Sequence, residues 1–125
     1  MRKKVSIARR TIPVAVLFCV TCYANAGGIT PLDKLANCQS VVNQMVQDVR
    51  GRGMDVEPRT KVMFSSAAFA LYHDVDVAYH ERKSVSERRA QLFGEVLQIT
   101  ESMNSRDRPR VHAYFKTVRF WCGVP

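Results

Sequence analysis

Residues 31–50 read PLDKLANCQSVVNQMVQDVR, and this stretch decides the fold class. Its apolar residues recur at alternating spacings of three and four, at Leu35, Cys38, Val42, Met45 and Val49. That spacing places them in one stripe along an α-helix. Thr30 and Pro31 form a typical helix start, and Gly51 and Gly53 form a typical end. The sequence therefore predicts a helix over about 31–50.

The helical periodicity continues after this segment. A second helix is predicted from Pro58 to about Lys83. Its apolar stripe comprises Phe64, Ala67, Ala68, Leu71, Val75 and Ala78, and is widened by Val62, Phe69, Tyr72 and Tyr79. A stripe this wide predicts contact with more than one neighbouring helix.

Two further helices are predicted in the last third of the chain. Ser84 and Glu87 have the spacing of a capping box, so a third helix is expected from there to about 103. Gly94 within it is interpreted as a mark of close helix packing. Asp107 is expected to cap a fourth helix, with Pro109 in its first turn.

These segments predict an all-α fold, because none shows the sustained alternation of a half-buried strand. Short connections make consecutive helices antiparallel, which gives a small up-down-up-down four-helix bundle. This topology brings Cys38 and Cys122 to the same end of the bundle, and we expect them to form a disulfide. Trp121 is expected to pack on it.

The first 26 residues are predicted to be a cleaved secretory signal peptide of the Sec type. A basic leader precedes an apolar stretch, Ile12 to Tyr23, and Ala24 and Ala26 supply the cleavage pattern. Cleavage after Ala26 leaves 27–125 as a single helical domain with no transmembrane segment. The expected location is the periplasm or the extracellular medium, where disulfides form.

Export changes the meaning of the net charge. The chain has 125 residues, 19 of them Lys or Arg and 11 Asp or Glu, for a net charge of +8. Residues 1–26 contain five of the basic residues and none of the acidic ones, so the exported part has 14 basic residues and a net charge of +3. A mildly basic exported domain without interleaved aromatic and basic residues is not expected to bind nucleic acid.

Arginines gather in the two predicted loops that an antiparallel bundle places at the end opposite the disulfide. The candidate partner-binding residues are Arg50, Arg52, Arg106, Arg108 and Arg110, with Arg59 close by. The guanidinium group suits carboxylate or phosphate partners. One interpretation is therefore a protein-binding surface, and the other is a pair of solvated polar loops.

A second candidate lies on the predicted second helix. His73, Asp76 and His80 share one face of it, which raises the possibility of a metal site. However, two turns separate the histidines by about 10 Å along the axis, too far for one ion. We therefore expect a polar, solvent-facing stripe.

No catalytic motif and no cofactor-binding motif is present in the sequence, so an enzyme is not expected. An export signal, about 100 helical residues and one disulfide resemble the format of small periplasmic immunity proteins against secreted cell-wall toxins. The format equally resembles accessory proteins of envelope secretion or conjugation systems. The sequence-based hypothesis is protein–protein binding in the bacterial envelope, the alternatives being a small-ligand or metal-binding bundle and an uncatalogued small envelope enzyme.

Overall fold

The computed structural model describes residues 28–51, 53–81 and 86–125, and they contain four helices. The helices are α2 (Pro31–Arg50), α3 (Pro58–Glu81), α4 (Ser86–Glu101) and α5 (Arg108–Trp121), all within the compact unit Pro31–Pro125. No strand occurs among the described residues, so the predicted all-α class is confirmed. The predicted signal peptide, Arg52 and the Ser84–Val85 start of the capping box lie outside the described residues.

Helices α2 and α3 begin where the local sequence predicts. Pro31 and Pro58 are the first residues of α2 and α3, positions at which a missing N–H breaks no helical hydrogen bond. After α2, Gly53 has a φ of 89°, a conformation that glycine adopts without steric cost. None of the helices in the described part of the chain is long and apolar enough to cross a membrane.

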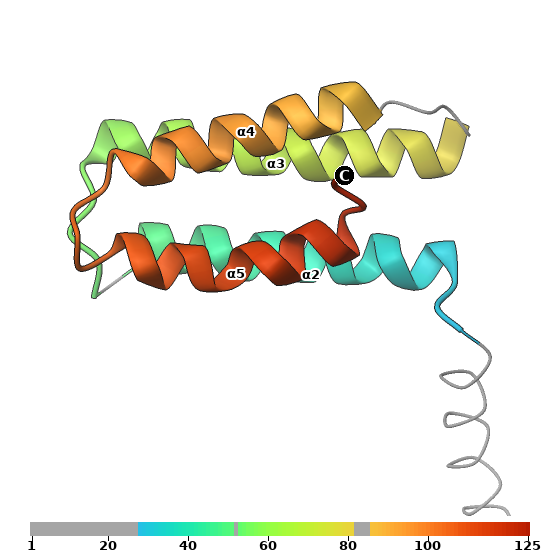
Figure 1. The fold of residues 1–125 in the computed structure, drawn as a ribbon, viewed down its shortest axis with the longest axis horizontal. Helices are drawn as coiled ribbons and strands as arrows, with labels where there is room; N and C mark the ends of the chain where they lie inside the picture. The colour runs from blue at the N-terminus through green and yellow to red at the C-terminus, as the bar shows by residue number, and fades with distance from the viewer. Residues whose placement is uncertain (1–27, 52, 82–85) are drawn as a thin grey trace, which may run out of the picture. The chain divides into compact units, whose positions relative to one another are not determined.

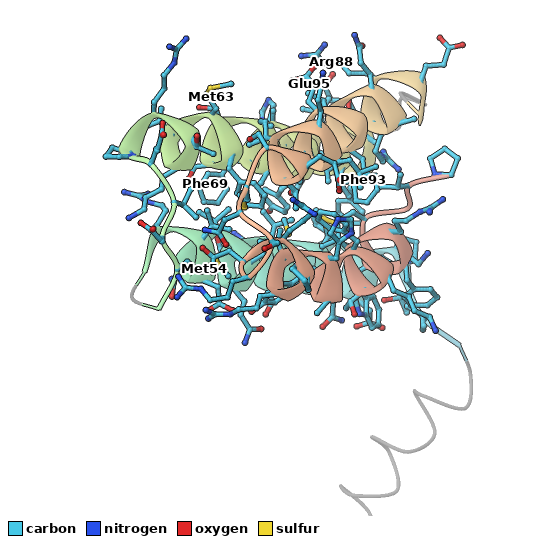
Figure 2. The ribbon with its side chains drawn as sticks, turned by 60° about the vertical axis from the view of Figure 1, so that its left-hand side comes forward. Met54, Met63, Phe69, Arg88, Phe93 and Glu95 are labelled. Carbon is cyan, nitrogen blue, oxygen red and sulfur yellow. A yellow bond between two sulfur atoms is a disulfide. The ribbon has the colours of Figure 1, made fainter. Side chains whose placement is uncertain are left out.

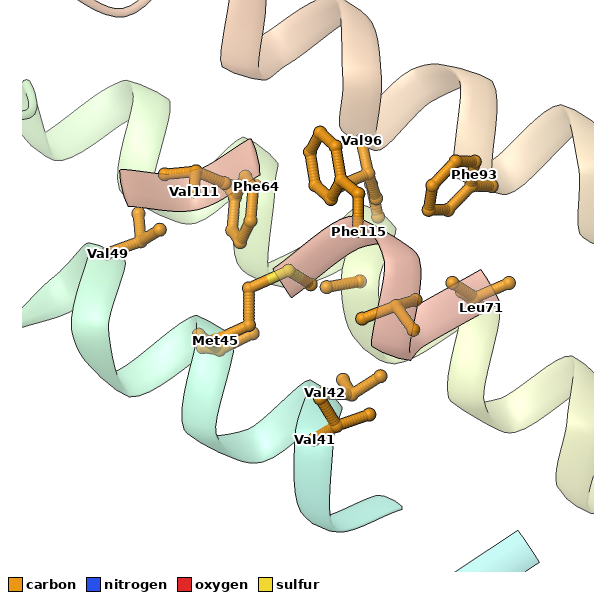
Figure 3. Close-up of a cluster of buried hydrophobic side chains, with 14 of the residues drawn as sticks. Val41, Val42, Met45, Val49, Phe64, Leu71, Phe93, Val96, Val111 and Phe115 are labelled. Carbon is orange, nitrogen blue, oxygen red and sulfur yellow. The ribbon is translucent and has the colours of Figure 1, made fainter. Parts of the chain in front are cut away.

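The four helices pack around one hydrophobic core. α2 packs against α3 and α5, α3 also packs against α4, and α4 and α5 touch more sparsely (Figure 1). The predicted stripe of α2 is buried, and Val41 and Val46 widen it. Figure 3 shows the centre of the core, where side chains from all four helices meet. There the Phe93 and Phe115 rings lie edge to face with centroids 5.4 Å apart.

Two details of the predicted packing are wrong. α3 does contact two helices, but most residues expected to widen its stripe face water, with exposed fractions of 66% for Val62, 41% for Phe69 and 38% for Tyr79. The neighbouring helices α2 and α4 do not cover the face of α3 that carries these three residues. Gly94 is exposed, and a Cβ added to it would meet nothing within 4 Å, so it marks no close helix approach.

The two cysteines lie at disulfide distance, with sulfur atoms 2.19 Å and Cα atoms 4.8 Å apart. Both cysteines are fully buried. Their pairing joins the N-terminal half of α2 to the end of α5, across 84 positions of sequence. Trp121 is half-buried and packs against the core cluster that contains both cysteines, and its direct contact with the disulfide stays a prediction.

Candidate functional site

The connection between α2 and α3 meets the connection between α4 and α5, and we call the described residues of the two together the loop pole (residues 51, 53–57 and 102–107). The backbone N–H of Asp55 donates to Oδ2 of Asp107 at 2.8 Å. The side-chain amide of Asn104 donates to the carbonyl of Asp55 at 3.3 Å. These two bonds cross between the loops and fix them to each other.

Asp107 is the centre of this network. Its side chain is fully buried and accepts hydrogen bonds from Asp55 N, from Asn104 Nδ2 at 2.9 Å and from Arg106 Nε at 3.3 Å. Asn104 Oδ1 in turn accepts from the backbone N–H groups of Arg106 and Asp107, at 3.0 and 2.8 Å. A buried carboxylate is costly unless it is hydrogen-bonded. The loop pole satisfies that requirement, which indicates an ordered surface.

The pKa of Asp107 follows from the same contacts. Burial is the largest influence and acts to raise the pKa. The hydrogen bonds from Asp55, Asn104 and Arg106, together with the charge of Arg106, outweigh it, so the pKa lies below the ordinary value of 3.8. Asp107 is therefore a buried anion.

The expectation that the Asp107 side chain caps α5 is wrong. Asp107 stands at the N-cap position, but its φ of −85° and ψ of −30° are helical and its side chain makes no cap hydrogen bond. A capping side chain needs the extended backbone typical of N-caps. The carboxylate bonds to the opposite loop instead, and the backbone carbonyl of Asp107 accepts from Arg110 and Val111.

Two of the predicted partner-binding arginines are used inside the protein. Arg108 is half-buried, donates to the carbonyl of Met103 at 3.2 Å, and has a buried Nε with no partner among the described atoms. Arg110 donates to the carbonyl of Gly53 in the opposite loop. Both guanidinium groups therefore help to hold the loop pole together.

Three other arginines face outward, and we call them the rim arginines: Arg50, Arg59 and Arg106. The Arg106 side chain is 68% exposed although its Nε reaches Asp107. Arg50 and Arg59 are also exposed, and their guanidinium groups make no hydrogen bond or ion pair with the residues the structure describes. The rim arginines can therefore reach a partner without giving up a bond to another helix.

A groove runs between α3 and α4 from the loop pole. It has a polar hollow of about 600 Å³ and a more apolar hollow of about 410 Å³. The polar hollow is lined by Asp55, Val56, Glu57, Thr60, Ser102, Met103 and Asn104, and the apolar one by Thr60, Met63, Glu95, Gln98, Ile99 and Ser102. Since Thr60 and Ser102 line both, the hollows form one α3–α4 groove.

The histidine stripe of α3 faces solvent. His73 is exposed, and His80 Nδ1 lies 3.0 Å from Oδ1 of the half-buried Asp76. Within the described part of the chain, no three His, Cys, Asp or Glu side chains converge as they would to hold a metal ion. The structure therefore brings His80 and Asp76 together and adds no third ligand.

Two partly buried polar contacts between helices were missed from the sequence. Asp74 of α3 pairs with Arg89 of α4 at 3.1 Å, and Arg89 also donates to the Gly123 carbonyl at 3.4 Å. The Tyr114 hydroxyl of α5 donates to Asp48 of α2. The burial of Asp74 could have been predicted, because this residue follows Ala67 and Leu71 at helical spacing on the buried stripe.

Comparison with models of known protein families, with curated proteins and with solved structures found no significant match for this chain.

Proposed function

We propose that this chain is a small exported protein that binds another protein of the bacterial envelope through the loop pole. The hydrogen-bond network around Asp107 carries the proposal, because it gives two connecting loops the order of a binding surface. Preorganised loops lose little conformational entropy on association. The rim arginines supply the residue type that is enriched in interface hot spots.

The export part of the proposal rests on the first 26 residues and on the cysteines. We propose that a Sec-type signal peptide is cleaved after Ala26, and that an up-down-up-down bundle locked by one disulfide is released into the periplasm or medium. The Cys38–Cys122 pair is compatible with an oxidising compartment. Immunity-type inhibition and an accessory role in envelope secretion or conjugation are both forms of the proposed binding.

The test is quantitative co-purification from the native envelope, followed by mass spectrometry. The double variant R50E/R59E reverses two rim charges without touching the Asp107 network. The matched control R88E/K116E reverses two exposed charges on α4 and α5, away from the loop pole. We expect R50E/R59E to lose the bound protein and R88E/K116E to retain it. A partner that both variants retain equally would contradict binding through the rim arginines.

Arg106 needs a gentler substitution, because a glutamate there would repel the buried Asp107 carboxylate. R106Q removes the charge and keeps a side-chain donor. We expect R106Q to weaken the same complex while its thermal midpoint stays close to that of the unmodified protein.

A further inference from the structure

We infer that the α3–α4 groove holds a segment of the partner that carries a lysine or arginine beside apolar residues. This inference deepens the proposed function and rests on it. The sequence directs attention to arginines at this end of the molecule, and hence to an acidic partner. The α3–α4 groove, by contrast, is lined by acidic side chains, which suit a basic ligand.

The polar end of the groove presents carboxylates that no cation of the described chain neutralises. Asp55 and Glu57 are exposed and line it. Asp55 is held by its backbone, since its N–H donates to Asp107 and its carbonyl accepts from Asn104. The Asp55 and Glu57 side chains make no ion pair with the described residues. The Asp55 backbone is thus held in place, and both carboxylates are exposed without an ion pair from the described residues.

The other end of the groove combines an apolar surface with a third carboxylate. Met63 of α3 is 47% exposed, and Ile99 of α4 lines the hollow opposite it. Figure 2 shows Met63 and Glu95 projecting on the same side of the α3–α4 pair. Glu95 is exposed and makes no ion pair with the described residues. Methionine adapts its shape readily to a bound side chain.

Charge complementarity selects the occupant. Three carboxylates and no lysine or arginine are among the described residues that line the groove. Arg108 and Arg110 are bonded to loop carbonyls instead. A lysine or arginine places its charge at carboxylates while its alkyl stem packs on apolar surface. The groove offers carboxylates and apolar surface one after the other along its length. It therefore suits a short segment that carries basic and apolar residues.

The rim arginines add a second condition to recognition. They lie in or next to the loops of the loop pole, where the groove begins, so a partner whose acidic residues lie beside the inserted basic segment suits both. Surfaces of mixed charge reject partners of uniform charge. A uniformly acidic surface is therefore disfavoured by the groove, and a uniformly basic one by its rim.

The experiment is chemical-shift mapping on the ¹⁵N-labelled exported protein with two short capped peptides. One has leucines at helical spacing flanked by lysines, and the other has glutamates in place of the lysines. The test variant is D55N/E57Q/E95Q, which removes the groove charges and keeps side-chain size. The control is E87Q, which neutralises an exposed glutamate two turns before Glu95 on α4.

The lysine peptide is expected to shift amides at 55–63 and 95–104. Its affinity should fall about tenfold in D55N/E57Q/E95Q, the sum of three exposed charge contacts, and stay unchanged in E87Q. Absence of shifts in the groove, tighter binding of the glutamate peptide, or equal effects of both variants would overturn the inference. Self-association of the protein that D55N/E57Q/E95Q abolishes would also overturn it, since the occupant would then be a second copy.

The same co-purification distinguishes failure of the groove inference from failure of the proposed function. If the envelope partner is lost with R50E/R59E and fully retained with D55N/E57Q/E95Q, the loop pole binds a protein and the groove does not hold it. If both variants retain the partner, the proposed function fails together with the inference.

Discussion

At the scale of single residues, Asp107 links the electrostatics of the loop pole to folding. A carboxylate whose pKa is lower in the folded than in the unfolded state stabilises the fold only while it is ionised. Asp107 is such a group, because three donors surround it and Arg106 adds a positive charge. Its contribution is present above the ordinary pKa of 3.8 and is lost as the pH falls through the lower folded-state value.

We expect Asp107→Asn to lower the urea midpoint at pH 6, because the amide loses the charge and, with its oxygen toward Asp55 and Asn104, places a donor where Arg106 already donates. The difference between the two proteins should begin to narrow as the pH falls below 3.8, where the unfolded-state carboxylate becomes protonated, and should be lost as the pH falls through the lower folded-state pKa. Urea unfolding followed by circular dichroism between pH 6 and pH 2.5 measures this. A difference that stays constant over the whole range would contradict the assigned role.

Gly94 gives a second prediction for a single residue. It lies inside α4, is exposed, and has open space where a Cβ would stand. Alanine loses less backbone entropy than glycine in a helix, so Gly94→Ala should raise the free energy of unfolding by about 1 kcal/mol. Gly53→Ala is the contrasting variant, since its φ of 89° makes alanine unfavourable and predicts destabilisation. Destabilisation by Gly94→Ala would show that its surroundings are tighter than the structure indicates.

At the scale of the helices, polar side-chain contacts join pairs of helices. The apolar stripes alone do not specify which helices form these pairs. Arg89 ties α4 to Asp74 of α3 and to the chain end at Gly123. Tyr114 ties α5 to Asp48 of α2. Such contacts depend on side chains more than 12 positions apart, and helical periodicity within one segment does not predict them.

The contact between Tyr114 and Asp48 can be measured through the pKa of the Tyr114 hydroxyl. Burial first, and then the hydrogen bond and charge of Asp48, raise its pKa from 10.0 to about 12. Because the folded-state pKa is raised, this contact stabilises the fold below about pH 10 and is lost as the pH rises toward 12. Absorbance titration at alkaline pH should show a late-ionising tyrosine that is missing in Tyr114→Phe.

The same substitution should lower the free energy of unfolding at pH 7 by about 1 kcal/mol, because Asp48 loses its hydrogen-bond donor. Tyr79→Phe is the control, since that ring is 38% exposed on α3. If Tyr114→Phe and Tyr79→Phe gave the same titration curve, Tyr114 would not be the raised group.

Helix positions and the disulfide partners followed from the sequence, whereas the details of the site did not. Pro31 and Pro58 fix helix starts locally, and the predicted stripe from Leu35 to Val49 forms most of the buried face of α2. By contrast, the roles of Arg108 and Arg110 depend on carbonyls of Met103 and Gly53 that only the folded loops bring within reach. The α3–α4 groove is likewise a product of packing.

At the scale of the whole molecule, the Cys38–Cys122 pair closes almost the entire helical unit. Closing a loop of 84 residues stabilises a fold by about 4.5 kcal/mol in the chain-entropy model. The total stability of a domain of this size is on the order of 5–15 kcal/mol. Cys38→Ser/Cys122→Ser should therefore lower the free energy of unfolding by about 4 kcal/mol at pH 7. A double variant as stable as the oxidised protein would show that the pair does not contribute as a crosslink.

We propose that the loop pole is the surface that meets another protein. The measurement is site-specific photocrosslinking in the native host, comparing Ser105→p-benzoylphenylalanine in the loop pole with Lys116→p-benzoylphenylalanine on the exposed face of α5. Position 105 lies beside the rim arginine Arg106 and leaves it intact. We expect one discrete protein adduct from position 105 and none from position 116. An adduct from position 116 alone would contradict the proposal, because the partner would then contact α5 and leave the loop pole free.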